Sequence, residues 1–201
     1  MNSDYFCRKA TLNDNLEQIA KYIHLTDPYI YPKISSDPSG SSWINFISEC
    51  VRTPDNVFNI KNISVVIYGS DIVGIACVIP CKKKLTITND IHIPSEISDR
   101  IQAAVEGYFN PLIEESYFYD GYNIVNVCID EKYRGKGLGS LLMSHCIHEY
   151  GSDTIHLDVI ASNESAIQLY KKYGFKIENE YLGYTGDDTL LPCYHMIREL
   201  G

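Results

Sequence analysis

Positive charge is scarce in this chain. Its 201 residues include 17 lysines and arginines against 26 aspartates and glutamates, which leaves a formal net charge of -9. Because nucleic-acid binding needs clustered Lys and Arg against the phosphates, we expect no nucleic-acid partner. An acidic surface keeps a protein soluble, and it would also steer a cationic amine toward the molecule.

The sequence also lacks a long apolar run. No stretch approaches the ~20 residues that a membrane-spanning helix needs, so we expect no membrane association. The segment from Met1 to Tyr5 has neither a basic region nor an apolar core, so we expect no secretory signal peptide.

Cysteine pairs at metal or redox spacing are missing as well. The seven cysteines are scattered without a C-x-x-C pair, and the six histidines do not group with them at zinc-ligand spacing. We therefore expect no metal site. Reduced thiols are typical of the cytoplasm, which is the location that we predict.

The apolar patterns that are present predict strands alternating with helices. Strands are expected over residues 5–9, 63–68, 72–79, 122–129, 155–160, 175–181 and 193–199. Helices are expected after a cap at Thr11 or Asn13, with Leu12 on the inner face, and over 42–51, 135–150 and 163–173, with a weaker pattern from Ile97 to Tyr108. This order predicts an α/β (α+β) fold with a mixed sheet, and the length fits a single domain over residues 1–201.

The most informative segment runs from Val127 to Leu142. A buried strand leads into the glycine-rich turn 134–139, with the sequence RGKGLG, and a helix follows at once. Such a turn aims free backbone N–H groups at one point beside the positive end of the helix dipole. Glycines also let an anion approach the backbone closely. The segment therefore predicts a pyrophosphate-binding loop.

Two common nucleotide motifs do not describe this loop. The P-loop string GxxxxGK[ST] is missing from the sequence. The dinucleotide fingerprint GxGxxG fits poorly, because the third glycine, Gly139, comes one residue too early.

The loop does resemble another signature. Residues 134–139 are similar to the R/Q-x-x-G-x-G/A signature of the GNAT superfamily of N-acetyltransferases, and residues 163–175 are similar to its second motif, N-x-x-A-x-x-x-Y-x-x-x-G-F. The two motifs stand in the family's order with one strand between them, and the close resemblance covers residues 122–180. It implies a GNAT-like fold, in which helices flank a central, mostly antiparallel twisted sheet of about six or seven strands. It also implies acetyl-CoA as co-substrate.

Residue by residue, the resemblance implies that the strand, the loop and the second motif all contact the cofactor. Val127 and Ile129, with Cys128 between them, would meet the pantetheine arm through the backbone, as an added strand would. Asn163 would contact the cofactor, although a helix N-cap explains it equally well. The residues predicted to hold the pyrophosphate are Arg134, Gly135, Lys136, Gly137, Leu138, Gly139 and Ser140.

Tyr170 occupies the position of the family's usual general acid, beside the cofactor. A phenol with a reference pKa of about 10 stays protonated at neutral pH, and it can protonate a thiolate whose pKa is about 8.5. The spacing of Tyr170 also suits a core aromatic side chain. Cys128 is interpreted as a small apolar strand residue rather than a nucleophile.

The general base is less clear from the residues. The strand from Tyr122 to Cys128 lacks the carboxylate that many relatives carry there. Asp120, just before this strand, is the base that we predict. Asp158 on the next strand and a relayed water molecule are the alternatives.

The acceptor side is predicted from a long insertion. Family members typically join the third and fourth strands by a tight hairpin, whereas here about 40 residues intervene, approximately 81–121. We expect the acidic and aromatic end of this insertion, which includes Tyr119, to shape an acceptor pocket together with Tyr29 and Tyr31. Packing of these rings onto the sheet is the alternative.

The function that the resemblance implies is an N-acetyltransferase. It would transfer the acetyl group of acetyl-CoA to a primary amine of a small molecule or peptide, by direct attack in a ternary complex. A non-catalytic CoA-binding sensor or scaffold and an enzyme for a longer acyl-CoA remain as alternatives. Dimers are common among such proteins, so a homodimer is compatible with this prediction.

Overall fold

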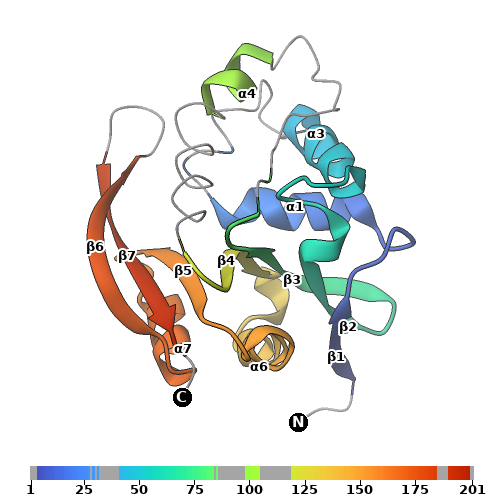
Figure 1. Cartoon of the computed structure of the whole chain (residues 1–201). Helices are drawn as coiled ribbons and strands as arrows, with labels where there is room; N and C mark the ends of the chain where they lie inside the picture. The colour runs from blue at the N-terminus through green and yellow to red at the C-terminus, as the bar shows by residue number, and fades with distance from the viewer. Residues whose placement is uncertain are drawn as a thin grey trace.

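One seven-stranded sheet forms the centre of the protein (Figure 1). The computed structural model describes residues 4–27, 29, 31, 41–83, 85, 98–104, 119–184 and 190–199. The strand order is β1-β2-β3-β4-β5-β7-β6, and only β4 and β5 run parallel to each other. No helix within these ranges is long and apolar enough to cross a membrane.

The elements follow the predicted order. The strands are β1 (Tyr5–Lys9), β2 (Ile63–Tyr68), β3 (Asp71–Pro80), β4 (Tyr122–Ile129), β5 (Ile155–Ile160), β6 (Lys176–Tyr184) and β7 (Leu190–Arg198). The helices are α1 (Leu16–Thr26), α3 (Ser41–Arg52), α4 (Ser98–Ala104), α6 (Leu138–Tyr150) and α7 (Glu164–Lys172), with short 3-10 turns η1 (Ile60–Asn62) and η3 (Glu131–Tyr133).

The predicted start of α1 is wrong by several residues. Asn15 is the N-cap, and its side chain accepts a hydrogen bond of 3.0 Å from the Gln18 N–H. Thr11 instead forms the preceding turn, where its N–H donates to the Asp14 carboxylate at 2.7 Å. Leu12 therefore lies outside the helix with 59% of its surface exposed.

Other bounds shift for physical reasons. α6 begins at Leu138 rather than Gly135, because Gly135 and Gly137 have φ values of 73° and 80° that a right-handed helix does not allow. The hairpin of β6 and β7 is longer than predicted, since the ladder continues to the pair Tyr184 and Leu190. The predicted insertion between the third and fourth strands is confirmed. Its described part consists of residues 81–83, 85, α4 and 119–121, and the rest of that segment lies outside the described residues.

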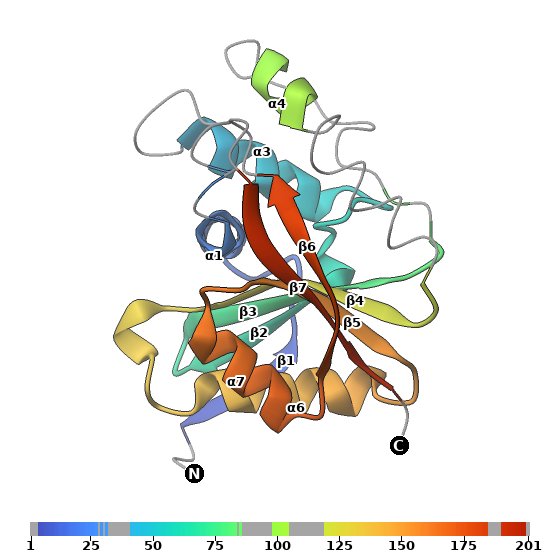
Figure 2. The same ribbon diagram turned by 90° about the vertical axis from the view of Figure 1, so that its left-hand side faces the viewer.

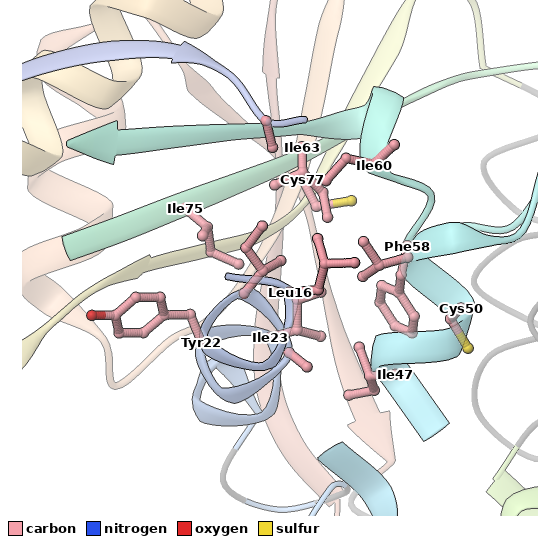
Figure 3. Packing of buried hydrophobic residues seen from close by; sticks show 14 of the residues in the cluster. Leu16, Tyr22, Ile23, Ile47, Cys50, Phe58, Ile60, Ile63, Ile75 and Cys77 are labelled. Atoms are coloured by element: carbon pink, nitrogen blue, oxygen red, sulfur yellow. The ribbon is translucent and has the colours of Figure 1, made fainter. Parts of the chain in front are cut away.

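Helices cover both faces of the sheet (Figure 2). α1 and α3 lie on one face, and α6 and α7 lie on the other. The α1/α3 face is packed by a buried cluster, part of which is drawn in Figure 3; its labelled members include Leu16, Ile23, Ile47, Phe58 and Ile75. A second cluster fills the α6/α7 face and includes Leu142, Met143, Leu157, Tyr170 and Met196.

A β-bulge interrupts the centre of the sheet. In the ladder between β3 and β4, Cys77 faces Asn126 and Val78 faces Ile124, so Val125 is the extra residue. The parallel pairing of β4 with β5 ends at Ile124 and Leu157, directly beside this bulge. A bulge bends its strand and increases the local twist, so β4 turns away from β5 at this point. The edge of β4 from Val125 to Ile129 is left unpaired by β5.

The close approach at Gly121 gives a test of how β4 is anchored. Gly121 has a φ of 89°, and a Cβ atom there would collide with the Thr154 carbonyl oxygen, which accepts the Tyr122 N–H at 2.9 Å. Gly121→Ala should therefore lower the free energy of unfolding by about 2–4 kcal/mol, measured by urea denaturation.

The matched control for this variant is Gly69→Ala. Gly69 has a φ of 60°, but a Cβ atom there meets no atom within 4 Å, so it tests the backbone strain alone. We expect a loss of about 1 kcal/mol for it. Equal losses in the two variants would contradict the collision with Thr154.

Candidate active site

The N-terminus of α6 is open to an anion. Gly137 caps the helix without any side-chain hydrogen bond, and the first turn holds no acidic residue. The first bond of the helix runs from the Leu141 N–H to the Gly137 carbonyl at 3.0 Å. The N–H groups of the residues between them therefore have no partner inside the helix, and they point out of its positive end.

The glycines of this loop differ in what they do. A Cβ atom at Gly135 or Gly137 would meet nothing within 4 Å, so their positive φ values and not the packing call for glycine. At Gly139 a Cβ atom would lie 3.2 Å from Leu169 on α7, so this glycine lets α7 pack against α6. The first two glycines leave open space along a row of backbone donors. This space is where the pyrophosphate of coenzyme A is predicted to bind.

Two cations lie beside the loop. The Arg134 Nε donates to the Ile129 carbonyl oxygen at 3.2 Å, and the Lys136 ammonium lies 4.8 Å from the centre of the Tyr133 ring. Both side chains belong to exposed residues. They add positive charge where the helix dipole already favours an anion.

Asp130 secures the end of β4 where the loop begins. Its carboxylate accepts the Lys132 N–H at 2.9 Å and the Tyr22 hydroxyl at 3.0 Å. Because Tyr22 belongs to α1, this contact ties the helix on the opposite face of the sheet to the start of the loop.

The backbone amides of β4 alternate between its two edges. The Asp130 N–H donates to the Val73 carbonyl on the β3 side at 2.9 Å. Amides two residues apart face the same edge, so the Cys128 N–H also faces β3, whereas those of Val127 and Ile129 face the gap toward β5. These are the two residues that we predict to meet the pantetheine arm.

The thiol of Cys128 is not activated. Its residue is buried to 7% exposure, and burial raises the pKa of the thiol to about 11. A thiol in that state is a poor nucleophile at neutral pH, which agrees with its interpretation as a small strand residue.

Tyr170 lies on the α6/α7 face. It is 7% exposed, and its ring centre lies 6.0 Å from that of Phe175. Among the described residues its hydroxyl makes no hydrogen bond. Burial, with a smaller contribution from Cys146, raises the pKa of this phenol to about 12, so it carries its proton at neutral pH. The side chain is thus both a core aromatic and an available proton donor.

Asn163 caps α7. Its side-chain oxygen accepts the Ala166 N–H at 3.3 Å and the Ser165 hydroxyl at 3.2 Å. The capping role is confirmed, and the contact with the cofactor stays a prediction.

An unusual pair of buried acceptors lies on β4 on either side of the bulge. The Thr26 hydroxyl donates to the Ile23 carbonyl at 2.6 Å, so it must accept the 2.7 Å bond from the Asn126 Nδ2. This fixes the amide of Asn126, and its Oδ1 is buried without a partner in the described structure. The Oδ1 of Asn123 is buried and unpartnered in the same way. Buried acceptors normally have a donor, so both atoms fit a ligand that offers N–H groups.

The predicted acceptor residues take different positions. Tyr31 is 3% exposed, packs 5.3 Å from the Trp43 ring, and its hydroxyl oxygen lies 3.5 Å from the Asn126 Nδ2. Tyr119 stacks on the rings of two histidines described below. Tyr29 is 38% exposed. Tyr31 and Tyr119 therefore lie against polar residues of the sheet, whereas Tyr29 is not brought into such a contact by the bonds described.

Asp120 points to solvent. Its side chain is 83% exposed and forms an ion pair with Lys82. The structure does not bring this carboxylate together with Tyr170 or with the loop through any bond within the described residues. Its role as the base stays a prediction.

Sequence reasoning named Asp158 as an alternative base but missed its two buried histidine partners. The Asp158 carboxylate lies 3.0 Å from His195, and His195 lies 3.2 Å from His156. His156 and Asp158 are two residues apart on β5, so they face the same side of the sheet. The alternation of His156 and Asp158 along β5 was the signal that the sequence offered for this cluster. The third residue, His195, comes from β7.

Comparisons with known proteins agree with this geometry. The family model described as acetyltransferase (GNAT) family matches residues 31–175. An N-alpha-acetyltransferase of Saccharolobus solfataricus is 31% identical over 113 residues, which cover 50% of this chain and 66% of that protein. The matched stretches cover between a fifth and two thirds of the length of the curated relatives that this chain resembles.

Solved structures share the fold. An N-acetyltransferase from Staphylococcus aureus Mu50 superposes with a TM-score of 0.75 at 19% identity, covering 96% of this chain and 99% of that one. A GNAT family acetyltransferase from Elizabethkingia anophelis with acetyl-CoA bound gives a TM-score of 0.59 at 14% identity, covering 98% and 99%. Since the family model matches well over half of the residues, this chain belongs to the acetyltransferase (GNAT) family.

Proposed function

We propose that this protein is an N-acetyltransferase that transfers the acetyl group of acetyl-CoA to a primary amine of a small molecule or peptide. The observation that carries the proposal is the free edge of β4, from Val125 to Ile129, which leads into the open N-terminus of α6. A pantetheine arm followed by a pyrophosphate matches this continuous line of backbone donors. The relative from Saccharolobus and the acetyl-CoA complex from Elizabethkingia support the same interpretation.

We assign binding of the amine to one face of the sheet and protonation of the leaving sulfur to the other. Acetyl-CoA supplies a thioester whose carbonyl carbon accepts the amine and whose sulfur leaves as a thiolate. The unpartnered oxygens of Asn123 and Asn126 on β4 would accept N–H groups of the amine. From the α6/α7 face, the Tyr170 hydroxyl would donate its proton to the departing sulfur. Direct transfer needs no acyl-enzyme, which agrees with the inert thiol of Cys128.

A cationic acceptor fits the charges near β7. Burial is the main cause that raises the pKa of the Cys193 thiol. The negative charges of Asp158 and Asp27 raise it further. Two carboxylates at this end of the sheet would attract an ammonium group. We also propose a reducing compartment for the protein, because all seven of its cysteines are free thiols.

Tyr170→Phe tests the proposed acid. The variant keeps the ring packing but removes the proton donor, so kcat should fall about 100-fold while the Kd for coenzyme A stays unchanged. Free-thiol release from acetyl-CoA against a panel of amines measures kcat, and calorimetry measures the Kd. Tyr194→Phe is the matched control, because Tyr194 packs against the same cluster and has no proposed role. Binding of coenzyme A without turnover on any amine or peptide would favour the sensor alternative.

The loop is tested by filling the open space at its glycines. Gly135→Ala and Gly137→Ala place a methyl group where a Cβ atom meets no protein atom. The Kd for coenzyme A should rise at least about tenfold for each, because about 1.4 kcal/mol of binding free energy is lost with the close backbone approach. Gly69→Ala carries a similar positive φ far from the loop and should leave the Kd unchanged. Unchanged Kd values in the loop variants would contradict the pyrophosphate site.

A further inference from the structure

Asp158, His195 and His156 form one hydrogen-bonded chain across β5 and β7. The Asp158 Oδ1 lies 3.0 Å from the His195 Nδ1, and the His195 Nε2 lies 3.2 Å from the His156 Nδ1. The chain ends where the His156 Nε2 lies 3.0 Å from the Asp120 backbone carbonyl oxygen. The rings of His156 and His195 are also stacked on Tyr119, at 4.5 and 4.8 Å.

The chemistry of these atoms fixes how many protons the chain holds. A carbonyl oxygen only accepts, so the His156 Nε2 must carry a hydrogen. One proton is then needed between the two histidines, and one more between His195 and Asp158. The three bonds therefore require three protons. Two neutral imidazoles and a carboxylate hold only two, so one of the three contacts lacks a hydrogen in this resting form, and one added proton completes the set.

The chain has a buried end and an exposed end. His156 is 4% exposed and His195 6%, whereas the side chain of Asp158 is 30% exposed. Asp158 comes one residue after Leu157, the last residue of β5 that pairs with β4, so it lies where the two strands have separated. A proton that enters at Asp158 can be held deeper in the chain by the two imidazoles.

The polar chain shares its face with the unpartnered acceptors on β4. His156 is the direct neighbour of Asn123 in the parallel ladder, so their side chains lie on the same face of the sheet. The oxygen of Asn123 is one of the two buried acceptors that fit an amine. The Asp158 carboxylate and the Asn123 oxygen thus lie on the same face of the sheet.

We infer that the chain Asp158–His195–His156 is the general base of this enzyme and takes the proton of the acceptor ammonium at Asp158. This inference rests on the proposed acetyltransferase function. In the resting form, which holds two protons, the three side chains carry one negative charge and one of their three hydrogen bonds is missing. Uptake of one proton neutralises the charge and restores the missing bond, which favours the transfer.

The step balances with the groups already named. The N–H bond of the ammonium breaks, and its proton forms an O–H bond at Asp158 and then passes to the His195 side. The freed lone pair of the amine attacks the thioester carbonyl carbon, and the C–S bond breaks. The attacking nitrogen then carries one proton too many, and it loses this second proton to solvent as the amide forms. Tyr170 gives its proton to the departing sulfur and regains one from solvent, and Asp158 releases the first proton to solvent after turnover. Asp158 is the catalytic residue, and His195 and His156 act through it.

Several other groups face the chain from neighbouring elements. Burial is the main cause that lowers the pKa of His156, and the charge of His195 lowers it further. The hydrogen bond to the Asp120 carbonyl and the charges of Asp158 and Asp120 raise it. The Tyr119 ring covers both imidazoles, and the Cys193 thiol of β7 lies within the field of Asp158. The lowered pKa of His156 favours its neutral imidazole, which is the form it takes when the three groups hold two protons.

Asp158→Asn is the decisive variant, because it keeps the shape and an acceptor oxygen for His195 but cannot take a proton. With a primary alkylamine, kcat/KM at pH 7 should fall about 100-fold. The loss should shrink as the pH rises toward the amine's own pKa of about 10.4, where the substrate is already neutral. With an aromatic amine, which is neutral at pH 7, the variant should retain most of the wild-type rate.

His195→Gln and His156→Gln report on the two inner members. Each should move the acidic limb of the pH profile with an alkylamine and leave the rate with the aromatic amine nearly unchanged. Glu178→Gln removes an exposed carboxylate from the neighbouring strand β6 and is the matched control. A purely structural role for Asp158 would lower the rates with both amines equally at every pH, and that result would overturn the inference. Loss of the pH dependence in Asp120→Asn, with the dependence kept in Asp158→Asn, would overturn it as well.

Nitrogen NMR of the imidazoles tests the chain without any turnover. In the wild type, His156 and His195 should share the uptake of a single proton, and Asp158→Asn should shift the midpoint of that titration downward because the compensating negative charge is gone. Independent titration of both rings, or a midpoint unmoved in the variant, would overturn the inference even if the enzyme is active. If the NMR result holds while no amine is acetylated, the proposed function fails and the proton-binding chain stands.

Discussion

A strand edge left unpaired inside a sheet needs partners for its backbone groups, because each buried N–H or C=O without a hydrogen bond costs free energy. Here the bulge at Val125 creates such an edge by turning β4 away from β5 after only three paired positions. The amides of Val127 and Ile129 face the resulting gap. A ligand with a peptide-like arm can supply the partners that β5 does not, and the open N-terminus of α6 follows directly along the chain for its charged end.

Groups from both faces of the sheet lie beside the gap between β4 and β5. On the α6/α7 face stand the open end of α6 and the protonated phenol of Tyr170. The opposite face carries the unpartnered oxygens of Asn123 and Asn126 and the chain that ends at Asp158. A donor that enters along β4 and an acceptor that enters from α1 would therefore meet between the strands. In the proposed mechanism one proton leaves the amine on the face of Asp158, and a different proton, that of Tyr170, reaches the sulfur from the other face.

Much of this arrangement was predictable from local patterns. The bounds of β1, β2, β4 and β5 follow from short apolar runs, and the loop follows from the glycines of residues 134–139. The start of α1 was missed because Thr11 and Asn15 are both good caps, and only the bonds of Asp14 assign Thr11 to the preceding turn. Composition and spacing do not distinguish such neighbours.

What escaped prediction depends on contacts between distant segments. The bulge at Val125 exists only relative to its partner β3, so the sequence of β4 alone does not reveal it. The histidine chain needs His195 from β7 opposite Asp158 from β5, a register that follows from the whole sheet. The sequence shows Asp120 and Asp158 as carboxylates near β4, but it does not show that two histidines stand behind Asp158.

Backbone hydrogen exchange along β4, with and without coenzyme A, tests the central claim most directly. The account predicts strong added protection of the Val127 and Ile129 amides on binding. The Cys128 and Asp130 amides, which already face β3, should change little. Protection confined to the α6 loop, with Val127 and Ile129 unchanged, would show that the free edge of β4 does not hold the ligand and would contradict the account.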